Sequence, residues 1–461
     1  IEGLNLDITN SSIGDYAVIE GHSFVNLTDV TINNWLKFED TGIAYLNNVT
    51  INSELFGKIR DLRLENIETG YGQDTLRVSK FWMSNSTFEE SSSNNANYYI
   101  YVSDLDNTNN ASSSDFYMFN STIKFVTSSN SYSFAFDINT TGDIRMIDSE
   151  INATNFETSK IESEGSDIWI TNSTLWSGTK YTGSGCYYRC SSEDLYSDLN
   201  IYGSDLEITN SLLHSRTEAP SLTSSSHYWM KTYNYVEISV DDLEIIDSSL
   251  TTYSYMNYIQ WGSSYRSVYS GIDIEATSFE SDNSTIMNEI GSPSNDNAGY
   301  IYPDFDIVIE GDNASFDVTD SFIGLEDWTD SYAGEDHIYI KETNYTLEIS
   351  DSEFRTNIYA CYNSGCNSTY YNSEVHVSDL ILYGHFFVEQ NSDVTIIDSE
   401  IKVNVKSDSV NLTVYDTNIG GELRSTVDPL MISVALTSKP GQSALVLFSG
   451  FLLVFLWISF F

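Results

Sequence analysis

Carboxylates are the reactive side chains that this chain holds in greatest number. It has 67 Asp and Glu residues, and Asp241-Asp242 is an adjacent pair. Hydrolysis of a glycosidic bond needs two carboxyl groups that face each other across one sugar linkage. Neighbours in a strand point to opposite faces, so this pair is not predicted to form such a site. Pairs of acids also arise by chance in so acidic a chain, and a solvated turn is the favoured interpretation. We expect no catalytic residue here.

Histidines are the second group that could do chemistry. None of the six lies at a sequence spacing typical of metal ligands. The chain also lacks a serine-nucleophile elbow, a phosphate loop and a dinucleotide fingerprint. We therefore predict no cofactor, with calcium in Asp-rich turns as the one cation option. The histidines are His22, His214, His227, His337, His376 and His385.

Four cysteines form two local pairs. Cys186 lies close to Cys190, and Cys361 lies close to Cys366. An even number of cysteines in short segments predicts one small disulfide in each segment and an oxidising compartment. The alternative is one zinc ion bound by four thiolates, which the wide separation of the two pairs disfavours.

Fourteen Asn-x-Ser/Thr sequons make N-glycosylation an option. The motif permits a glycan without proving one, because Asn-Ser-Thr is also part of the repeat described below. The candidate residues are Asn10, Asn26, Asn48, Asn85, Asn110, Asn120, Asn139, Asn152, Asn172, Asn283, Asn313, Asn344, Asn367 and Asn411.

Aromatic residues are dense between positions 253 and 269. Exposed in a loop, they could stack on sugar rings or anchor a protein partner. The alternative, which we favour, is that the rings cover the side of the folded chain. They are Tyr253, Tyr255, Tyr258, Trp261, Tyr265 and Tyr269.

The elements that position these residues are predicted to be strands. The formal net charge is -47, which leaves no basic patch for nucleic acid. The hydrophobic share of 41% and aromatic share of 14% exclude a disordered acidic tail. Abundant Ser, Thr, Asn and Asp indicate many turns, so we read the chain as all-β.

One pattern recurs along the chain: apolar, any, apolar, any, then Asn or Asp. Clear copies are Leu206-Glu207-Ile208-Thr209-Asn210, Leu243-Glu244-Ile245-Ile246-Asp247 and Leu347-Glu348-Ile349-Ser350-Asp351. Alternation places the apolar residues of each copy on the inner face of a strand and the glutamates on the outer face. Asn or Asp then ends the strand, because its short side chain tolerates the left-handed conformation.

Such units cannot bury an apolar face alone and must stack. We predict a right-handed parallel β-helix, or solenoid, with long loop insertions between its short strands. A β-sandwich is the alternative, but it does not explain the repeated terminal Asn or Asp.

The strand-Asn-Ser-strand units resemble the parallel β-helix repeats of surface adhesins, especially archaeal and bacterial ones. The resemblance covers about residues 1–420 and concerns the architecture. The chain departs from the commonest version of those repeats, which has Gly-Ile at the start of each turn of the helix. The same fold also occurs in pectin-degrading enzymes, but their Asn-Thr-Asp, Gly-His-Gly and Arg-Ile-Lys signatures are absent.

The last 18 residues, 444–461, carry no charge. As a helix they would span about 27 Å, enough for the hydrocarbon core of a membrane. We predict an ectodomain over residues 1–425, a spacer over 426–443 and a transmembrane helix or anchor signal over 444–461. The absence of basic residues after the tail also suits a signal for a glycosylphosphatidylinositol anchor. Because the chain begins at Ile1, a secretory signal is expected to have been removed.

These features predict a membrane-anchored structural or adhesive protein on the outside of the cell, which is not an enzyme. Its partners would be surface glycans or proteins, contacted through loops, and not nucleic acid. One alternative is a polysaccharide lyase or glycosidase on the same scaffold. Another is a self-associating S-layer or sheath subunit.

Overall fold

The structure is a computed structural model, and it describes part of the chain. Side chains are described only up to residue 326, with gaps. The backbone is described for residues 5–70, 75–92, 100–103, 114–163, 166–180, 195–219, 229–256, 265–291, 301–311, 314–328, 336–341, 346–350, 353–359, 375–376, 381–382, 385–388, 393–397, 400–401, 404–407, 411–415, 418–419, 423–425, 433–435 and 446–448.

Every regular element in the described part of the chain is a β-strand, which confirms the all-β prediction. The chain divides into two compact units: unit 1 contains residues 1–222 and 232–240, and unit 2 contains residues 223–231 and 241–461. Strand β19 (Trp229–Ile246) contributes to both.

Unit 1 contains the first eighteen strands. They are β1 (Asn5–Ile13), β2 (Ala17–Glu20), β3 (Phe24–Ile32), β4 (Leu36–Ile51), β5 (Leu55–Glu65), β6 (Glu68–Thr69), β7 (Leu76–Ser84), β8 (Thr87–Ser92), β9 (Ile100–Val102), β10 (Asp115–Phe119), β11 (Thr122–Thr140), β12 (Ile144–Ile147), β13 (Glu150–Ser163), β14 (Ile168–Thr171), β15 (Thr174–Lys180), β16 (Leu195–Tyr202), β17 (Asp205–Thr209) and β18 (Leu212–Ala219).

Unit 2 contains the remaining strands. They are β20 (Ser249–Met256), β21 (Tyr265–Asp282), β22 (Thr285–Gly291), β23 (Ile301–Glu310), β24 (Ser315–Thr319), β25 (Phe322–Trp328), β26 (Asp336–Lys341), β27 (Thr346–Ser350), β28 (Glu353–Tyr359), β29 (Val375–His376), β30 (Ile381–Leu382), β31 (His385–Val388), β32 (Asp393–Ile397), β33 (Glu400–Ile401), β34 (Asn404–Ser407), β35 (Asn411–Tyr415), β36 (Asn418–Ile419), β37 (Leu423–Ser425), β38 (Ser433–Ala435) and β39 (Val446–Phe448).

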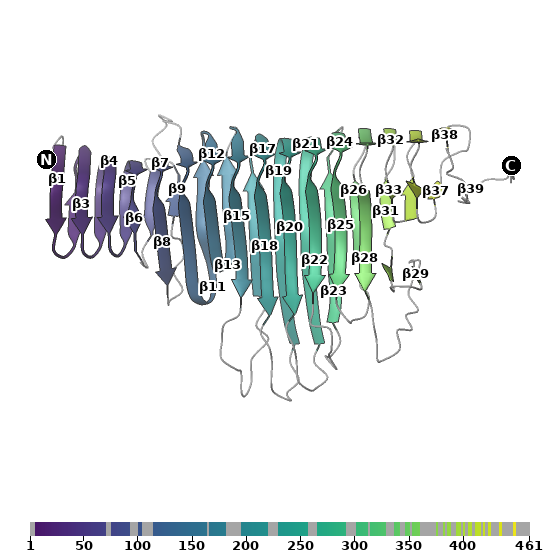
Figure 1. Cartoon of the computed structure of the whole chain (residues 1–461), viewed down its shortest axis with the longest axis horizontal. Coiled ribbons are helices and arrows are strands. Elements are labelled where there is room, and N and C mark those ends of the chain that lie inside the picture. Colours follow the sequence, from purple (N-terminus) through teal and green to yellow (C-terminus); the bar gives the residue numbers. More distant parts are fainter. Residues whose placement is uncertain are drawn as a thin grey trace. The chain divides into compact units, whose positions relative to one another are not determined.

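The strands of unit 1 form three parallel ladders, in which each strand pairs with a later one (Figure 1). Ladder 1 runs through β1, β3, β4, β5, β7, β10, β12, β14 and β17. Ladder 2 begins with the C-terminal ends of β1, β3 and β4. It continues through β6, β8, β11, β13, β15 and β18. Ladder 3 runs through β2, β4, β5, β7, β9, β11, β13, β16 and β19.

Unit 2 follows the same scheme. One ladder joins β20, β22, β25, β28, β33 and β36, and a second joins β21, β24, β27, β32, β35 and β38. The third joins β21, β23, β26, β31, β34, β37 and β39. The pairings of β30 with β28 and with β29 are antiparallel.

Alternation along the strands places the core where the repeat predicts it. Leu206, Ile208, Leu243 and Ile245 are each at most 2% exposed, which confirms their predicted inward direction. The side chains of Leu347, Ile349 and Glu348 lie outside the described residues. Glu207 and Glu244 are half-buried rather than fully solvated.

The Asn or Asp that ends a repeat unit lies at a corner of the backbone. All thirteen described non-glycine residues with a positive φ are Asn or Asp, with φ between 42° and 55°. L-residues with larger or branched side chains are disfavoured there, because Cβ approaches the following carbonyl oxygen. The corner side chains also bond to one another: Asn172 Nδ2 donates to Asp148 Oδ1 (3.2 Å), and Asn210 Nδ2 donates to Asn172 Oδ1 (2.6 Å).

A buried serine follows most of these corners. The Ser173 hydroxyl donates to the Thr171 carbonyl (2.7 Å) and accepts the backbone N–H of Ser149 (3.0 Å). The Ser173 N–H in turn donates to the Ser211 hydroxyl (2.9 Å). The recurring Asn-Ser pair thus combines a left-handed corner with a hydroxyl that satisfies buried backbone groups.

Replacing Asn172 by valine should lower the free energy of unfolding by about 2 kcal/mol. A β-branched side chain at φ 49° is strained, and the hydrogen bonds to Asp148 and Asn210 are lost. Asn172→Gly is the matched control, because it removes the amide but fits the left-handed backbone. In urea unfolding, Asn172→Gly should lose about half as much stability as Asn172→Val. Equal losses in both variants would contradict the proposed backbone strain.

Most of the predicted tail lies outside the described residues. Its residues Val446–Phe448 form β39, which pairs in parallel with β37. The predicted helix is therefore wrong for these three residues, because their backbone groups pair with another strand. No helix in the described part of the chain is long and apolar enough to cross a membrane.

Candidate binding face of unit 1

Ladder 1 places six large outward side chains in one row. We name Tyr45, Arg63, Trp82, Tyr117, Arg145 and Trp169 the aromatic–arginine row. Each is the direct partner of the next on a neighbouring parallel strand, from β4 through β5, β7, β10 and β12 to β14. The residues on either side of them along each strand point inward and form the core, so the row lies on the outer surface.

Arg145 lies at the centre of the closest contacts in the row. Its guanidinium carbon is 4.2 Å from the centre of the Trp169 ring and 5.9 Å from that of Tyr117. Its Nη2 donates to Asp143 (3.1 Å). A cation held between two aromatic rings is attracted by both.

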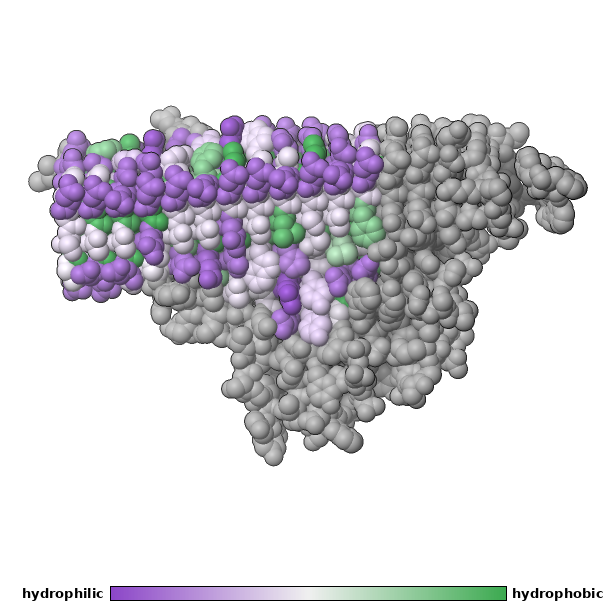
Figure 2. Space-filling view, viewed as in Figure 1, coloured by the Kyte–Doolittle hydropathy of each residue, from purple (hydrophilic) through white to green (hydrophobic). Residues whose placement is uncertain are grey.

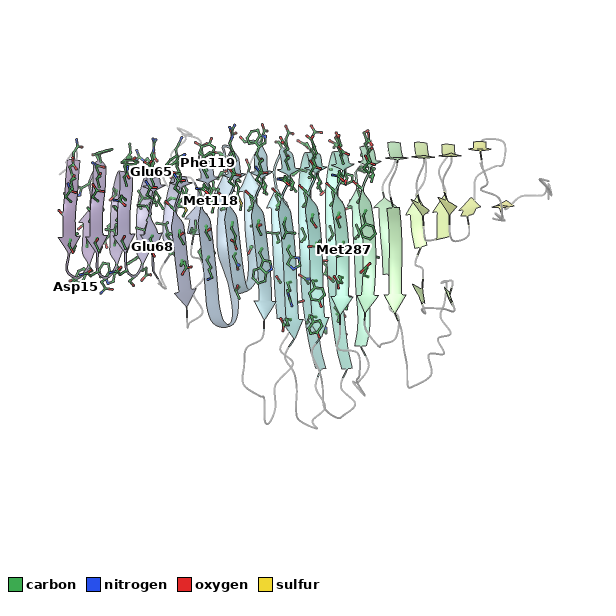
Figure 3. The ribbon with its side chains drawn as sticks, viewed as in Figure 1. Asp15, Glu65, Glu68, Met118, Phe119 and Met287 are labelled. Carbon is green, nitrogen blue, oxygen red and sulfur yellow. The ribbon has the colours of Figure 1, made fainter. Side chains whose placement is uncertain are left out.

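The next outward row extends this aromatic surface. The Trp82 and Phe119 ring centres are 6.3 Å apart, and those of Tyr117 and Phe119 are 6.4 Å apart. Glu65 occupies the same row as Phe119, two strands earlier (Figure 3). It accepts hydrogen bonds from the Tyr45 hydroxyl and from Asn47.

Acidic residues flank the row two positions earlier. Asp61 accepts two hydrogen bonds from Arg63, at 3.2 Å and 3.1 Å, which raise the pKa of that guanidinium. Asp115 pairs with Lys80 at 3.1 Å. Burial raises the pKa of the Tyr117 hydroxyl, and the carboxylates of Asp115 and Asp143 raise it further. Tyr117 is therefore a neutral donor at physiological pH.

Several polar groups of the row have no partner among the described residues. No described residue bonds to the indole N–H of Trp82, the indole N–H of Trp169 or the hydroxyl of Tyr117. All three side chains are half-buried, with their apolar rings held in place by neighbours. Rings next to free donors and flanking carboxylates suit a ligand with apolar C–H faces and hydroxyl edges, as sugars have.

Hydrophilic side chains form a band across unit 1. A band of hydrophilic residues crosses the strands of unit 1 on the side shown in Figure 2. The Asn and Asp corners contribute exposed amide and carboxylate groups, for example at Asn172 and Asp148. A hydrated ligand would thus meet hydrogen-bonding groups beside the aromatic row.

The described residues of the predicted aromatic cluster lie on strands rather than in an exposed loop, in line with the interpretation that we favoured. Tyr253 and Tyr255 lie half-buried on β20 with ring centres 5.9 Å apart, and Tyr269 lies half-buried on β21 beside Lys231. A Cβ added to Gly291 would come within 2.8 Å of the Tyr253 hydroxyl, so these rings pack over the neighbouring strand. Tyr258, Trp261 and the side chain of Tyr265 lie outside the described residues.

The sequons separate into two structural classes. Asn26, Asn139 and Asn152 lie within strands without a left-handed backbone, and the backbone of Asn411 begins β35. The remainder of the described set occupies left-handed corners: Asn10, Asn48, Asn85, Asn120, Asn172 and Asn283. Asn110, Asn313, Asn344 and Asn367 lie outside the described residues.

The acidic pair and the histidines do not form a site in the described part of the chain. Asp241 and Asp242 are exposed on β19. No group of three potential metal ligands occurs among the described residues. The register of β26 and β31 pairs the backbone of His337 with that of His385, which their spacing in the sequence does not indicate. His227 and all four cysteines, Cys186, Cys190, Cys361 and Cys366, lie outside the described residues.

The chain matches no protein-family model, no curated protein and no solved structure. The candidate site therefore rests on the geometry of unit 1 alone.

Proposed function

We propose that the chain is a right-handed parallel β-helix that acts as a structural or adhesive protein on the outside of the cell. Three parallel ladders in each unit, joined at left-handed Asn and Asp corners, support this architecture. The large negative charge suits a hydrated, self-repelling surface. Attachment to the membrane through residues 444–461 remains part of the proposal.

We further propose that the aromatic–arginine row contacts carbohydrate. The observation that carries this is the alignment of Trp82, Tyr117, Arg145 and Trp169 on consecutive strands of ladder 1. Neighbouring strands lie about 4.8 Å apart, so the row offers a regular series of contacts to an extended polymer. A chain contacting several members at once would gain affinity from each.

The test is binding of the full chain to immobilised neutral hexose polymers and uronic-acid polymers. We expect the neutral polymers to bind more tightly, because uronates are repelled by the net charge of -47. Trp169→Ala and Trp82→Ala should each weaken binding by roughly tenfold, or about 1.4 kcal/mol.

Tyr196→Ala is the matched control. Tyr196 stacks on Tyr233 at 4.6 Å, but on ladder 3 rather than ladder 1. Its loss should leave binding unchanged. The proposal is overturned if neither class of polymer binds, or if Tyr196→Ala weakens binding as much as the tryptophan variants do.

A further inference from the structure

Three ionisable residues meet on the outer face of β11 and β13 in unit 1. Asp137 on β11 is the direct partner of Lys160 on β13. Glu162 follows Lys160 by two positions, on the same face, and its Oε2 lies 2.5 Å from Lys160 Nζ. The paired strands therefore place an amine and two carboxyl groups on one face, with the amine in contact with Glu162 and in register with Asp137.

Asp137 is in an unfavourable state as a free carboxylate. Its Oδ1 is buried and has no hydrogen-bond partner among the described residues. Burial raises its pKa, Lys160 lowers it, and Glu162 raises it again. A buried carboxylate oxygen without a partner costs free energy, which neutralisation of the group would relieve.

The neighbours of Lys160 hold its amine in place. Asn139 Nδ2 donates to Glu162 Oε2 (2.9 Å), and Lys160 Nζ lies 5.5 Å from the centre of the Tyr202 ring. The side chains of Lys160 and Glu162 are 29% and 24% exposed. Both groups are thus partly withdrawn from water, with Tyr202 beside the amine and Asn139 bound to the carboxylate.

Two other lysines of unit 1 have only part of this arrangement. Lys80 directly opposes Asp115 and pairs with it at 3.1 Å, while the other neighbouring acid, Asp61, is bound by Arg63. Lys37 pairs with Glu39 two positions later, as Lys160 does with Glu162. The partners of Lys37 on the neighbouring strands are the apolar residues Val18 and Phe56.

We propose that Lys160 and Asp137 form an intrachain isopeptide bond, with Glu162 as the proton carrier. Glu162 takes a proton from the Lys160 ammonium, and the neutral amine attacks Cγ of Asp137. As the amide forms, the nitrogen loses a second proton, and both protons pass through Glu162 to the departing carboxyl oxygen, which leaves as water. A Cγ–Nζ bond forms, a Cγ–O bond breaks, and one water leaves. Ammonium and carboxylate become amide and water, so no oxidant or other co-reactant is needed.

The bond would join β11 to β13 covalently and remove two charges from a partly buried site. A protein that bears load outside the cell would gain resistance to unfolding from such a link. The inference stands on the three residues themselves and is independent of carbohydrate binding at the aromatic–arginine row.

The test is the mass of the purified full chain after reduction and denaturation. We expect a mass lower by one water than the sequence requires, and a branched peptide joining Asp137 to Lys160 after proteolysis. Glu162→Gln keeps both reacting residues and should retain the full mass. Lys160→Arg should also retain it, and a thermal melt would show that each variant is folded.

Asp137→Asn gives a sharper result. Its side chain would release ammonia instead of water, so the linked variant should have the same mass as the linked wild type. Lys37→Arg and Lys80→Arg are matched controls that should still lose one water. Full mass in the wild type, or a loss of water that persists in Lys160→Arg, would overturn the proposal.

Discussion

Replacing Asn288 by alanine is expected to lower the free energy of unfolding of unit 2 by roughly 3–4 kcal/mol. Asn288 is fully buried on β22. Its Oδ1 accepts hydrogen bonds from Thr252 and Ser270, both at 2.7 Å. Its Nδ2 donates to the carbonyls of Ser270 (2.9 Å) and Asp306 (3.1 Å). Alanine would remove all four of these hydrogen bonds from a buried site, and urea unfolding would measure the loss.

A second variant separates lost hydrogen bonds from lost volume. Replacing Thr252, Ser270 and Asn288 together by Val, Ala and Leu removes the hydroxyls along with the amide. Such a substitution leaves fewer unsatisfied groups and should recover part of the stability lost in Asn288→Ala. A loss below about 1 kcal/mol for Asn288→Ala would show that water satisfies these groups instead.

This polar interior is one feature that sequence patterning did not reveal. Thr252 and Ser254 were not recognised as buried residues. They continue the inward phase of Leu250, since every second residue of a strand faces the same side. The polar side chains of Thr252 and Ser254 favour a position on the outer face, whereas the alternation along the strand predicts the inner face. The alternation decides the outcome, because Asn288 offers a hydrogen-bond partner inside the fold.

The repeat unit itself was predictable because its causes are local. Leu206 and Ile208 alternate with polar residues, and Asn210 adopts the left-handed conformation that its side chain tolerates. The role of Ser211 was not foreseen, since its hydroxyl bonds to the Ile170 carbonyl, forty-one residues earlier. Such a contact depends on register between strands, which irregular spacing between units conceals.

The aromatic–arginine row was missed for the same reason, although a signal was present. Trp82, Tyr117, Arg145 and Trp169 each occupy the second position of a repeat unit. Aligning the units on their apolar residues would have placed these four side chains in one row. Clustering of aromatic residues along the chain singles out the segment from Tyr253 to Tyr269 instead.

His214 should make unit 1 less stable in mild acid. Burial, and to a lesser extent the charge of Arg216, lowers the pKa of His214 from 6.5 to about 4. Below about pH 6.5 the unfolded histidine binds a proton that the folded one does not. Stability attributable to this residue is therefore complete above about pH 6.5 and is lost as the pH falls towards 4. Allowing for its partial exposure, we expect a loss of roughly 2–3 kcal/mol.

The measurement is urea unfolding of the wild type and of His214→Gln across this pH range. Acid also neutralises carboxylates and relieves repulsion in so acidic a chain, but this effect is common to both proteins and cancels in their difference. The wild type should lose stability relative to His214→Gln as the pH falls below about 6.5. Arg216→Gln should reduce the slope only slightly, because burial is the larger cause. A difference between wild type and His214→Gln that does not change with pH would contradict the lowered pKa and the buried, uncharged state of this imidazole.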